Sequence, residues 1–136
     1  MGGKLFARME GCPFGMIGDN EFMMKITAPV DDNGMLAPGF GRARKMAIAT
    51  FEEKTLVDYE VIDVGWDILH DEGPHGSHHG RIVRFLKEHD IDRVLCAGMG
   101  ESMAHTINKM GLPLFRHDPI DIRQALDEVA AYPVDR

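Results

Sequence analysis

A short and wholly apolar run, Val94-Leu95-Cys96-Ala97, stands between two segments with helical periodicity, and it restricts the possible folds most. A strand whose residues are all apolar is covered on both faces, as the parallel strands of α/β proteins are. Parallel strands need a crossover connection, which is nearly always right-handed. The run therefore predicts a sheet with helices packed on its faces.

Three amphipathic segments predict the helices. The first is expected to begin at Ser77, a favourable N-cap residue, and to end near His89. The second follows Gly100 and ends near Gly111, which suits a C-terminal cap. For the third we expect Asp118 as the cap, with Pro119 at the first helical position. Its predicted buried face consists of Ile122, Ala125, Leu126, Val129 and Ala130.

Strand patterns account for most of the remaining chain. A first strand begins near Met24, and residues Lys45 to Phe51 and Thr55 to Val64 form two more, joined by a hairpin. Val94–Ala97 is the fourth strand, and Leu112 to Phe115 is the fifth. The order is β-β-β-α-β-α-β-α, so we expect an α/β protein with one mixed sheet.

Composition limits the class of protein. At 136 residues, the chain can form a single core; we assign this domain to residues 23–136 and treat residues 1–22 as an extension outside it. A net charge of −7 argues against nucleic acid as a partner. Cys12 and Cys96 form no disulfide framework, and free thiols fit a reducing cytoplasm. No apolar run is long enough to predict a membrane span.

The sheet topology predicts where a ligand site lies. Open α/β sheets bind ligands at the carboxyl ends of their parallel strands. The loops after the first, third, fourth and fifth strands should emerge at one edge, because these strands share a direction. That edge would gather Asp31, Asp32, Phe40, Arg42, the histidine segment at 70–79, Gly98-Met99-Gly100-Glu101 and His117.

Histidines concentrate before and at the start of the first helix. Four of the seven in the chain are His70, His75, His78 and His79. A helix N-terminus favours neutral imidazole, which can bind a metal. We therefore regard His75, His78 and His79 as candidate metal ligands; capping, or packing beside Ile82, is the alternative. No thiolates lie nearby in sequence, so a closed structural zinc site is not favoured.

Two glycine-containing loops are candidates for the rest of a binding site. Gly98-Met99-Gly100 lies between a strand and a helix, where backbone N–H groups can bind an anion, although any tight turn could use the same glycines. Met99 is a soft donor or a space-filling side chain. Arg42 could bind a carboxylate or a negatively charged cluster, or belong to a structural turn. No nucleophile elbow occurs, so catalysis is not the default expectation.

Four segments, taken in order, resemble the dinitrogenase iron–molybdenum cofactor biosynthesis family. They are Ile26-Thr27-Ala28-Pro29-Val30-Asp31-Asp32-Asn33-Gly34, Phe40-Gly41-Arg42-Ala43, His75-Gly76-Ser77-His78-His79-Gly80-Arg81-Ile82-Val83-Arg84-Phe85-Leu86 and Ala97-Gly98-Met99-Gly100. The similarity extends from about Met24 to Val129. It implies a ribonuclease-H-like three-layer α/β/α fold with a five-stranded mixed sheet. It also implies a protein that is not an enzyme.

The resemblance further implies a small carrier of an iron–sulfur or molybdenum–iron type cluster, with metallocluster donor and acceptor proteins as partners. A histidine often precedes Phe-Gly in this family, whereas this chain has Gly39. We expect His75, His78 and His79 to replace it as ligands, and Arg42 and Gly98-Met99-Gly100 to shape the pocket. Homo-oligomerisation is compatible with this expectation.

Two other functions stay open from the sequence. The first is a non-enzymatic binding or regulatory module for a small anionic ligand or a protein partner, which would use the same sheet edge without a metal. The second is a hydrolase that uses a single metal ion at the histidines.

Overall fold

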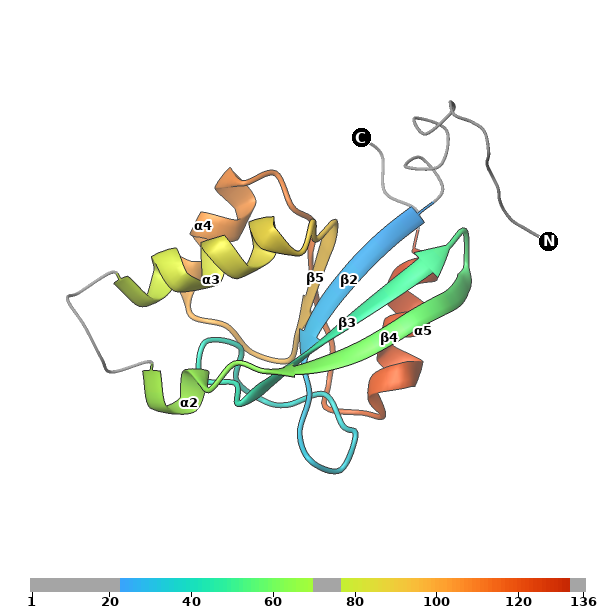
Figure 1. Cartoon of the computed structure of the whole chain (residues 1–136), viewed down its shortest axis with the longest axis horizontal. Helices are drawn as coiled ribbons and strands as arrows, with labels where there is room; N and C mark the ends of the chain where they lie inside the picture. The colour runs from blue at the N-terminus through green and yellow to red at the C-terminus, as the bar shows by residue number, and fades with distance from the viewer. Residues whose placement is uncertain (1–22, 70–76, 133–136) are drawn as a thin grey trace.

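The computed structural model describes residues 23–69 and 77–132, and it contains five strands and four helices in that part of the chain (Figure 1). In chain order these are β2 (Met23–Pro29), β3 (Lys45–Glu52), β4 (Thr55–Asp63), α2 (Trp66–Leu69), α3 (Ser77–Glu88), β5 (Arg93–Cys96), α4 (Glu101–Lys109), β6 (Leu114–Arg116) and α5 (Ile122–Ala131).

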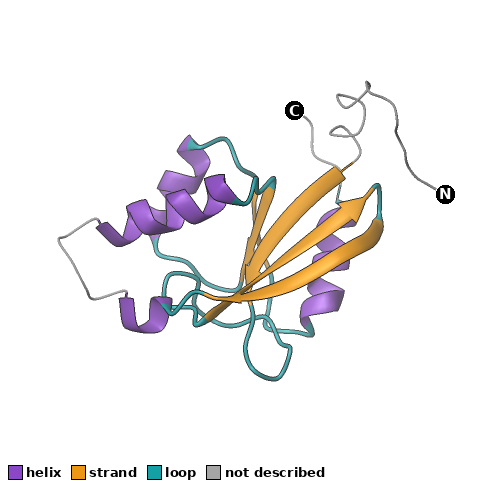
Figure 2. Cartoon of the chain, in the orientation of Figure 1, coloured by secondary structure: helices purple, strands orange, loops and turns teal. Residues whose placement is uncertain are grey.

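All five strands join one mixed sheet in the order β4-β3-β2-β5-β6. The β2–β3 and β3–β4 pairs are antiparallel, whereas the β2–β5 and β5–β6 pairs are parallel. Helices α3 and α4 cover one face of the sheet and α5 covers the other (Figure 2). The predicted three-layer α/β/α class with a five-stranded mixed sheet is therefore confirmed.

Strand β5 explains why an all-apolar run belongs at the centre of this fold. Val94 and Cys96 pack in the core beneath α3 and α4, and Leu95 packs in the core beneath α5. Successive side chains of a strand point to opposite faces, so a strand between two helical layers needs apolar residues at every position. All four residues of β5, including Arg93, are buried.

The start of the last helix differs from the prediction. Asp121, rather than Asp118, is the N-cap residue of α5, and its side chain accepts a hydrogen bond from the backbone N–H of Gln124 at 3.2 Å. A β-bridge between Met35 and Asp121 holds the backbone here. This contact between segments distant in sequence ties down the chain beside Asp121, so the helix begins after it. The five residues predicted for the buried face of this helix are all buried.

A short helix that the sequence patterns did not predict, α2, follows β4. Its first residue, Trp66, is 2% exposed and lies edge-on to Phe85 of α3, with ring centroids 5.3 Å apart. Trp66 thus packs its segment onto the core. None of the helices in the described part of the chain is long and apolar enough to cross a membrane.

Candidate functional site

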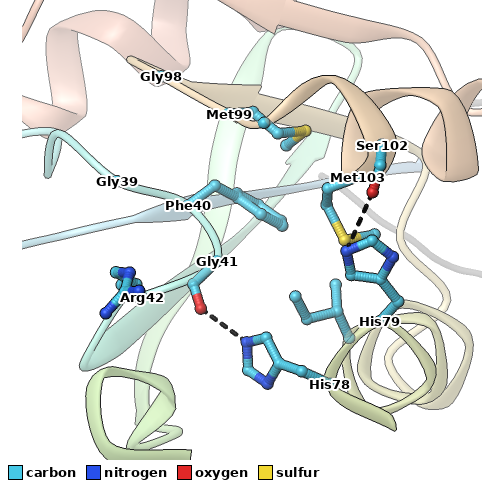
Figure 3. A pocket seen from close by; sticks show the side chains of 12 residues that line it. Gly39, Phe40, Gly41, Arg42, His78, His79, Gly98, Met99, Ser102 and Met103 are labelled. Carbon is cyan, nitrogen blue, oxygen red and sulfur yellow. Dashed lines mark hydrogen bonds between the residues drawn. The ribbon is translucent and has the colours of Figure 1, made fainter. Parts of the chain in front are cut away.

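A pocket of about 280 Å³ lies where the N-terminal part of α3, the loop from β5 into α4 and the loop before β3 come together (Figure 3). It is at the carboxyl end of β5, where ligand sites of open α/β sheets are found. Its lining consists of Gly39, Phe40, Gly41, Arg42, His78, His79, Ile82, Gly98, Met99, Gly100, Ser102 and Met103.

The two glycine-containing loops are in direct contact. Phe40 is 1% exposed, and its backbone N–H donates to the carbonyl oxygen of Gly98 at 3.2 Å. A Cβ atom added at Gly98 would lie 3.0 Å from the carbonyl oxygen of Pro38, closer than side chains normally approach. Glycine at position 98 therefore permits this close backbone approach, which forms one wall of the pocket.

His78 connects α3 to the loop before β3. Its Nε2–H donates to the carbonyl oxygen of Gly41 at 2.6 Å, and its Nδ1 lies 2.8 Å from a guanidinium nitrogen of Arg81. A carbonyl only accepts and a guanidinium only donates, so the ring is neutral and carries its hydrogen on Nε2. Arg81 also donates to the carbonyl of Leu69 at 3.1 Å. Both ring nitrogens of His78 are thus engaged with protein groups.

His79 points across the pocket toward α4. Its Nε2 lies 3.4 Å from the hydroxyl of Ser102, and Figure 3 shows its ring beside the sulfur of Met103. The 3.4 Å contact is long for a hydrogen bond to a hydroxyl. Because this contact is weak, the imidazole of His79 can turn to a ligand at little cost. Of the two described histidines in the pocket, His79 is better arranged as a ligand donor.

The electrostatics of the pocket favour an anion. Gly100 is the N-cap of α4 and supplies no side-chain hydrogen bond, and the first turn of α3 contributes His78 and His79 to the same pocket. The N-termini of both helices carry partial positive charge. Arg42 adds a cation, and no Asp, Glu or Cys occurs among the described lining residues. Consistently, no group of three His, Cys, Asp or Glu residues suited to a metal ion occurs within residues 23–69 and 77–132.

The structure brings together most of the residues expected at this edge. Arg42, His78, His79, Gly98, Met99 and Gly100 all line the pocket. His75, and with it His70, Asp71 and Glu72, lies outside the described residues.

The remaining expected residues have other environments. Glu101 is exposed in the first turn of α4 and is not among the lining residues. Asp31 accepts hydrogen bonds from the N–H groups of Asn33 and Met35, at 2.8 and 3.0 Å, within its own turn. Asp32 pairs with Lys45 at 2.9 Å, and this hydrogen-bonded cation lowers the pKa of the Asp32 carboxyl. His117 lies at a separate hollow, where its Nε2–H donates to Glu128 at 2.8 Å. These three residues do not line the pocket.

Ser102 and Met103 were not identified as site residues from the sequence. Met103 also packs in the core, where it is 5% exposed. Both follow Gly100 within one helical turn, so a search of the first turn after the Gly98-Met99-Gly100 loop would have found them. Cys96 is buried as expected, and burial raises the pKa of its thiol.

Comparisons with known proteins agree with this fold. The family model described as dinitrogenase iron-molybdenum cofactor matches residues 23–132. The apo form of the orange protein from Desulfovibrio gigas is similar over 79% of this chain and 87% of its own, with 17% identity and a TM-score of 0.62. A Thermotoga protein provisionally named as a NifB protein covers the same shares, with 19% identity and a TM-score of 0.59.

A third similar structure is a Methanocaldococcus jannaschii protein provisionally named as a dinitrogenase. It matches over 79% of this chain and 88% of its own, with 13% identity and a TM-score of 0.57. At these identities the three structures establish the shared fold alone. No curated protein matches the chain.

Proposed function

The chain belongs to the dinitrogenase iron–molybdenum cofactor family, and we propose that it binds and carries a metal–sulfur cluster of the iron–sulfur or molybdenum–iron type. The observation that carries this proposal is the lining of one pocket by imidazole, thioether and guanidinium groups at two helix N-termini, without a carboxylate among its described residues. Such a lining suits a cargo that is negatively charged and contains soft atoms.

The lining also limits how the cargo is held. Iron–sulfur clusters that are built into proteins are usually bound by cysteine thiolates. The described lining residues include no cysteine. On this proposal the described residues hold the cargo through few direct bonds to metal, which suits a carrier that must release it.

We assign the roles of the residues as follows. His79 is the principal imidazole ligand, and His75 is a second one from the segment before α3. For His78 to bind metal, its ring would have to give up Gly41 or Arg81, so its ligand role includes a movement of the loop at 38–42. Arg42 offsets the charge of the cargo, Met99 contacts it, and Gly98 and Gly100 allow it to approach the backbone.

On this proposal, the protein is a non-enzymatic carrier between cluster donor and acceptor proteins in the cytoplasm. A second candidate is a binding or regulatory module for a small metal-free anion, which the same helix N-termini and Arg42 would also accept. The two candidates differ in whether binding needs His75 and His79.

The test is anaerobic reconstitution of the full chain with iron and sulfide and, separately, addition of tetrathiomolybdate as a preformed anionic metal sulfide. Metal analysis and visible spectra would compare the wild type with His79→Ala and with the His75/His78/His79→Ala triple variant. His105→Ala is the matched control, because His105 is an exposed residue of α4 outside the pocket lining.

We expect charge-transfer bands and a stoichiometric metal content in the wild type and the control, and their loss in the triple variant. Retention of full binding in the triple variant would refute the histidine assignment. If neither metal preparation binds, but a small anion raises the melting temperature, the metal-free module is correct instead.

A further inference from the structure

Strand β4 forms an open edge of the sheet. It is the outermost strand, has nine residues and is paired only with β3 within the described sheet (Figure 1). Edge strands usually carry lysine, proline or inward-pointing charges that discourage further pairing. β4 contains no lysine, arginine or proline. A register shift between Thr50 and Phe51 leaves Val57 without a pairing partner, and such a bulge discourages further pairing at the start of the strand. Asp58–Asp63 remain in regular pairing with β3.

The side chains of this edge divide into two chemically distinct sets. Tyr59 and Val61 pair with Ala49 and Ala47, so they lie on the face that α5 covers farther along the sheet. They are nevertheless 39% and 45% exposed, and Val57 beside them is 47% exposed. α5 packs over the central strands and leaves Tyr59 and Val61 at the edge open to solvent.

The other face of the same strand is acidic. Asp58 and Glu60 pair with Thr50 and Ile48, which places them on the α3 and α4 side of the sheet. Both are exposed, and so are Glu52 at the end of β3 and Glu53 in the turn that leads into β4. An added strand would therefore meet apolar neighbours on one face and carboxylates on the other.

We propose that β4 is a docking edge that takes up an extended segment of a partner protein as a sixth strand, and that basic and apolar side chains alternate along this segment. Main-chain hydrogen bonds to the open edge would supply affinity. The alternation supplies specificity, because side chains of an added strand also point to opposite faces. Its apolar residues would lie beside Tyr59 and Val61, and its cations beside Asp58 and Glu60.

A second copy of this chain fits the edge poorly. The antiparallel register that aligns Val57, Tyr59 and Val61 of two copies places Asp58 opposite Glu60 at two positions. Like charges that face each other across strands are destabilising. The net charge of −7 adds a general repulsion between copies and an attraction for a basic segment. The inference stands on the sheet edge and does not depend on the proposed cluster site.

The test uses a fluorescent peptide of eight residues in which lysine and valine alternate, with an alternating glutamate–valine peptide as its counterpart. Binding to the full chain would be followed by anisotropy at low and high salt, and hydrogen exchange would locate the contact. Glu60→Lys is the test variant and Glu60→Gln a milder one. Glu88→Lys is the matched control, because Glu88 is an exposed residue of α3.

We expect the lysine–valine peptide to bind and to slow hydrogen exchange in β4. Its affinity should fall with added salt. Glu60→Lys should weaken it about tenfold, and Glu88→Lys should leave it unchanged. The proposal would be overturned if Glu60→Lys left the peptide affinity unchanged, or if the peptide slowed hydrogen exchange elsewhere than in β4.

Two other occupants would also overturn it. Concentration-dependent dimerisation that protects β4 without peptide would show that a second copy occupies the edge. Residues 4–9 of this chain, Lys-Leu-Phe-Ala-Arg-Met, match the proposed pattern in part, because both cations are at even positions and Leu5, Ala7 and Met9 are at odd ones. Protection of β4 in the free protein that disappears in a Lys4→Glu/Arg8→Glu variant would identify that segment as the occupant.

Discussion

The imidazole of His78 and the carbonyl of Gly41, 37 residues apart in sequence, are joined by a 2.6 Å hydrogen bond that fixes α3 to the loop before β3. The next residue, His79, instead lies beside Ser102 of α4 on the other side of the pocket. Two adjacent histidines therefore have different environments. The first is held in the pocket wall by contacts at both ring nitrogens, and the second has one long contact across the pocket.

Substitution of these two histidines should change the stability of the protein by different amounts. His78→Ala removes the hydrogen bond to Gly41, the contact with Arg81 and the edge-on packing against Trp66, so we expect it to lower the free energy of unfolding by about 2 kcal/mol. His79→Ala should change it by less than about 0.5 kcal/mol. Urea unfolding followed by the fluorescence of Trp66, the one tryptophan of the chain, measures both. Equal losses would contradict the division of roles.

Gly39→His should strengthen cluster binding. A Cβ added at Gly39 meets no atom within 4 Å, and Gly39 lines the pocket, so a side chain can start from this position without a clash at its Cβ. An additional imidazole at the position where the family often has histidine should lower the dissociation constant about tenfold, or ~1.4 kcal/mol. Anaerobic titration against Gly39→Ala gives the comparison. If the two variants bind equally, an imidazole at this position does not contact the cargo.

Gly98→Ala should lower stability and cluster affinity more than Gly39→Ala does, although both glycines line the same pocket. The new methyl group at position 98 would lie 3.0 Å from the carbonyl oxygen of Pro38 and would push the loops apart, which costs about 1–2 kcal/mol. Gly39→Ala meets open space and should leave stability unchanged or slightly higher. Thermal unfolding and cluster titration of both variants test this. Retained stability and affinity in Gly98→Ala would show that the loops do not need their close approach.

The pair formed by His117 and Glu128 should make stability depend on pH. The backbone carbonyl of Asp118, and then the carboxylate of Glu128, accept hydrogen bonds from the ring and raise the pKa of His117 above its usual value near 6.5. Because the pKa of His117 is raised in the folded state, the stabilisation of the fold by its protonated ring is complete below about pH 6.5. This stabilisation is lost as pH rises through the pKa of the folded state.

This pH dependence can be measured at the residue itself. NMR titration of the His117 ring should give a pKa above 6.5 in the wild type and a lower one in Glu128→Gln, which keeps the shape but not the charge. The melting temperature of the variant should depend less on pH above 6.5. An unchanged ring pKa in Glu128→Gln would show that Glu128 does not act on His117.

The sequence predicted the parts of the site better than their roles. Arg42, His78, His79 and Gly98-Met99-Gly100 were expected near one sheet edge because strand directions follow from the order of strands and helices. Their meeting in one pocket confirms that geometry, while their ligand roles stay predictions. Ser102 was missed because the periodicity of a helix does not distinguish a polar residue at a pocket from one in solvent; only its place in the first turn after the Gly98-Met99-Gly100 loop pointed to it.

Local periodicity determined the type, order and buried faces of the main strands and helices, because the spacing of apolar residues must match the geometry of a strand or a helix. Only the tertiary structure decided that α5 begins after Asp121, that α2 forms at Trp66, and that His78 supports the pocket wall while His79 faces Ser102. Each of these depends on groups far apart in the chain, such as Met35 with Asp121 or Gly41 with His78. Such contacts leave no periodic trace in the sequence, and they exist only once the layers have packed together.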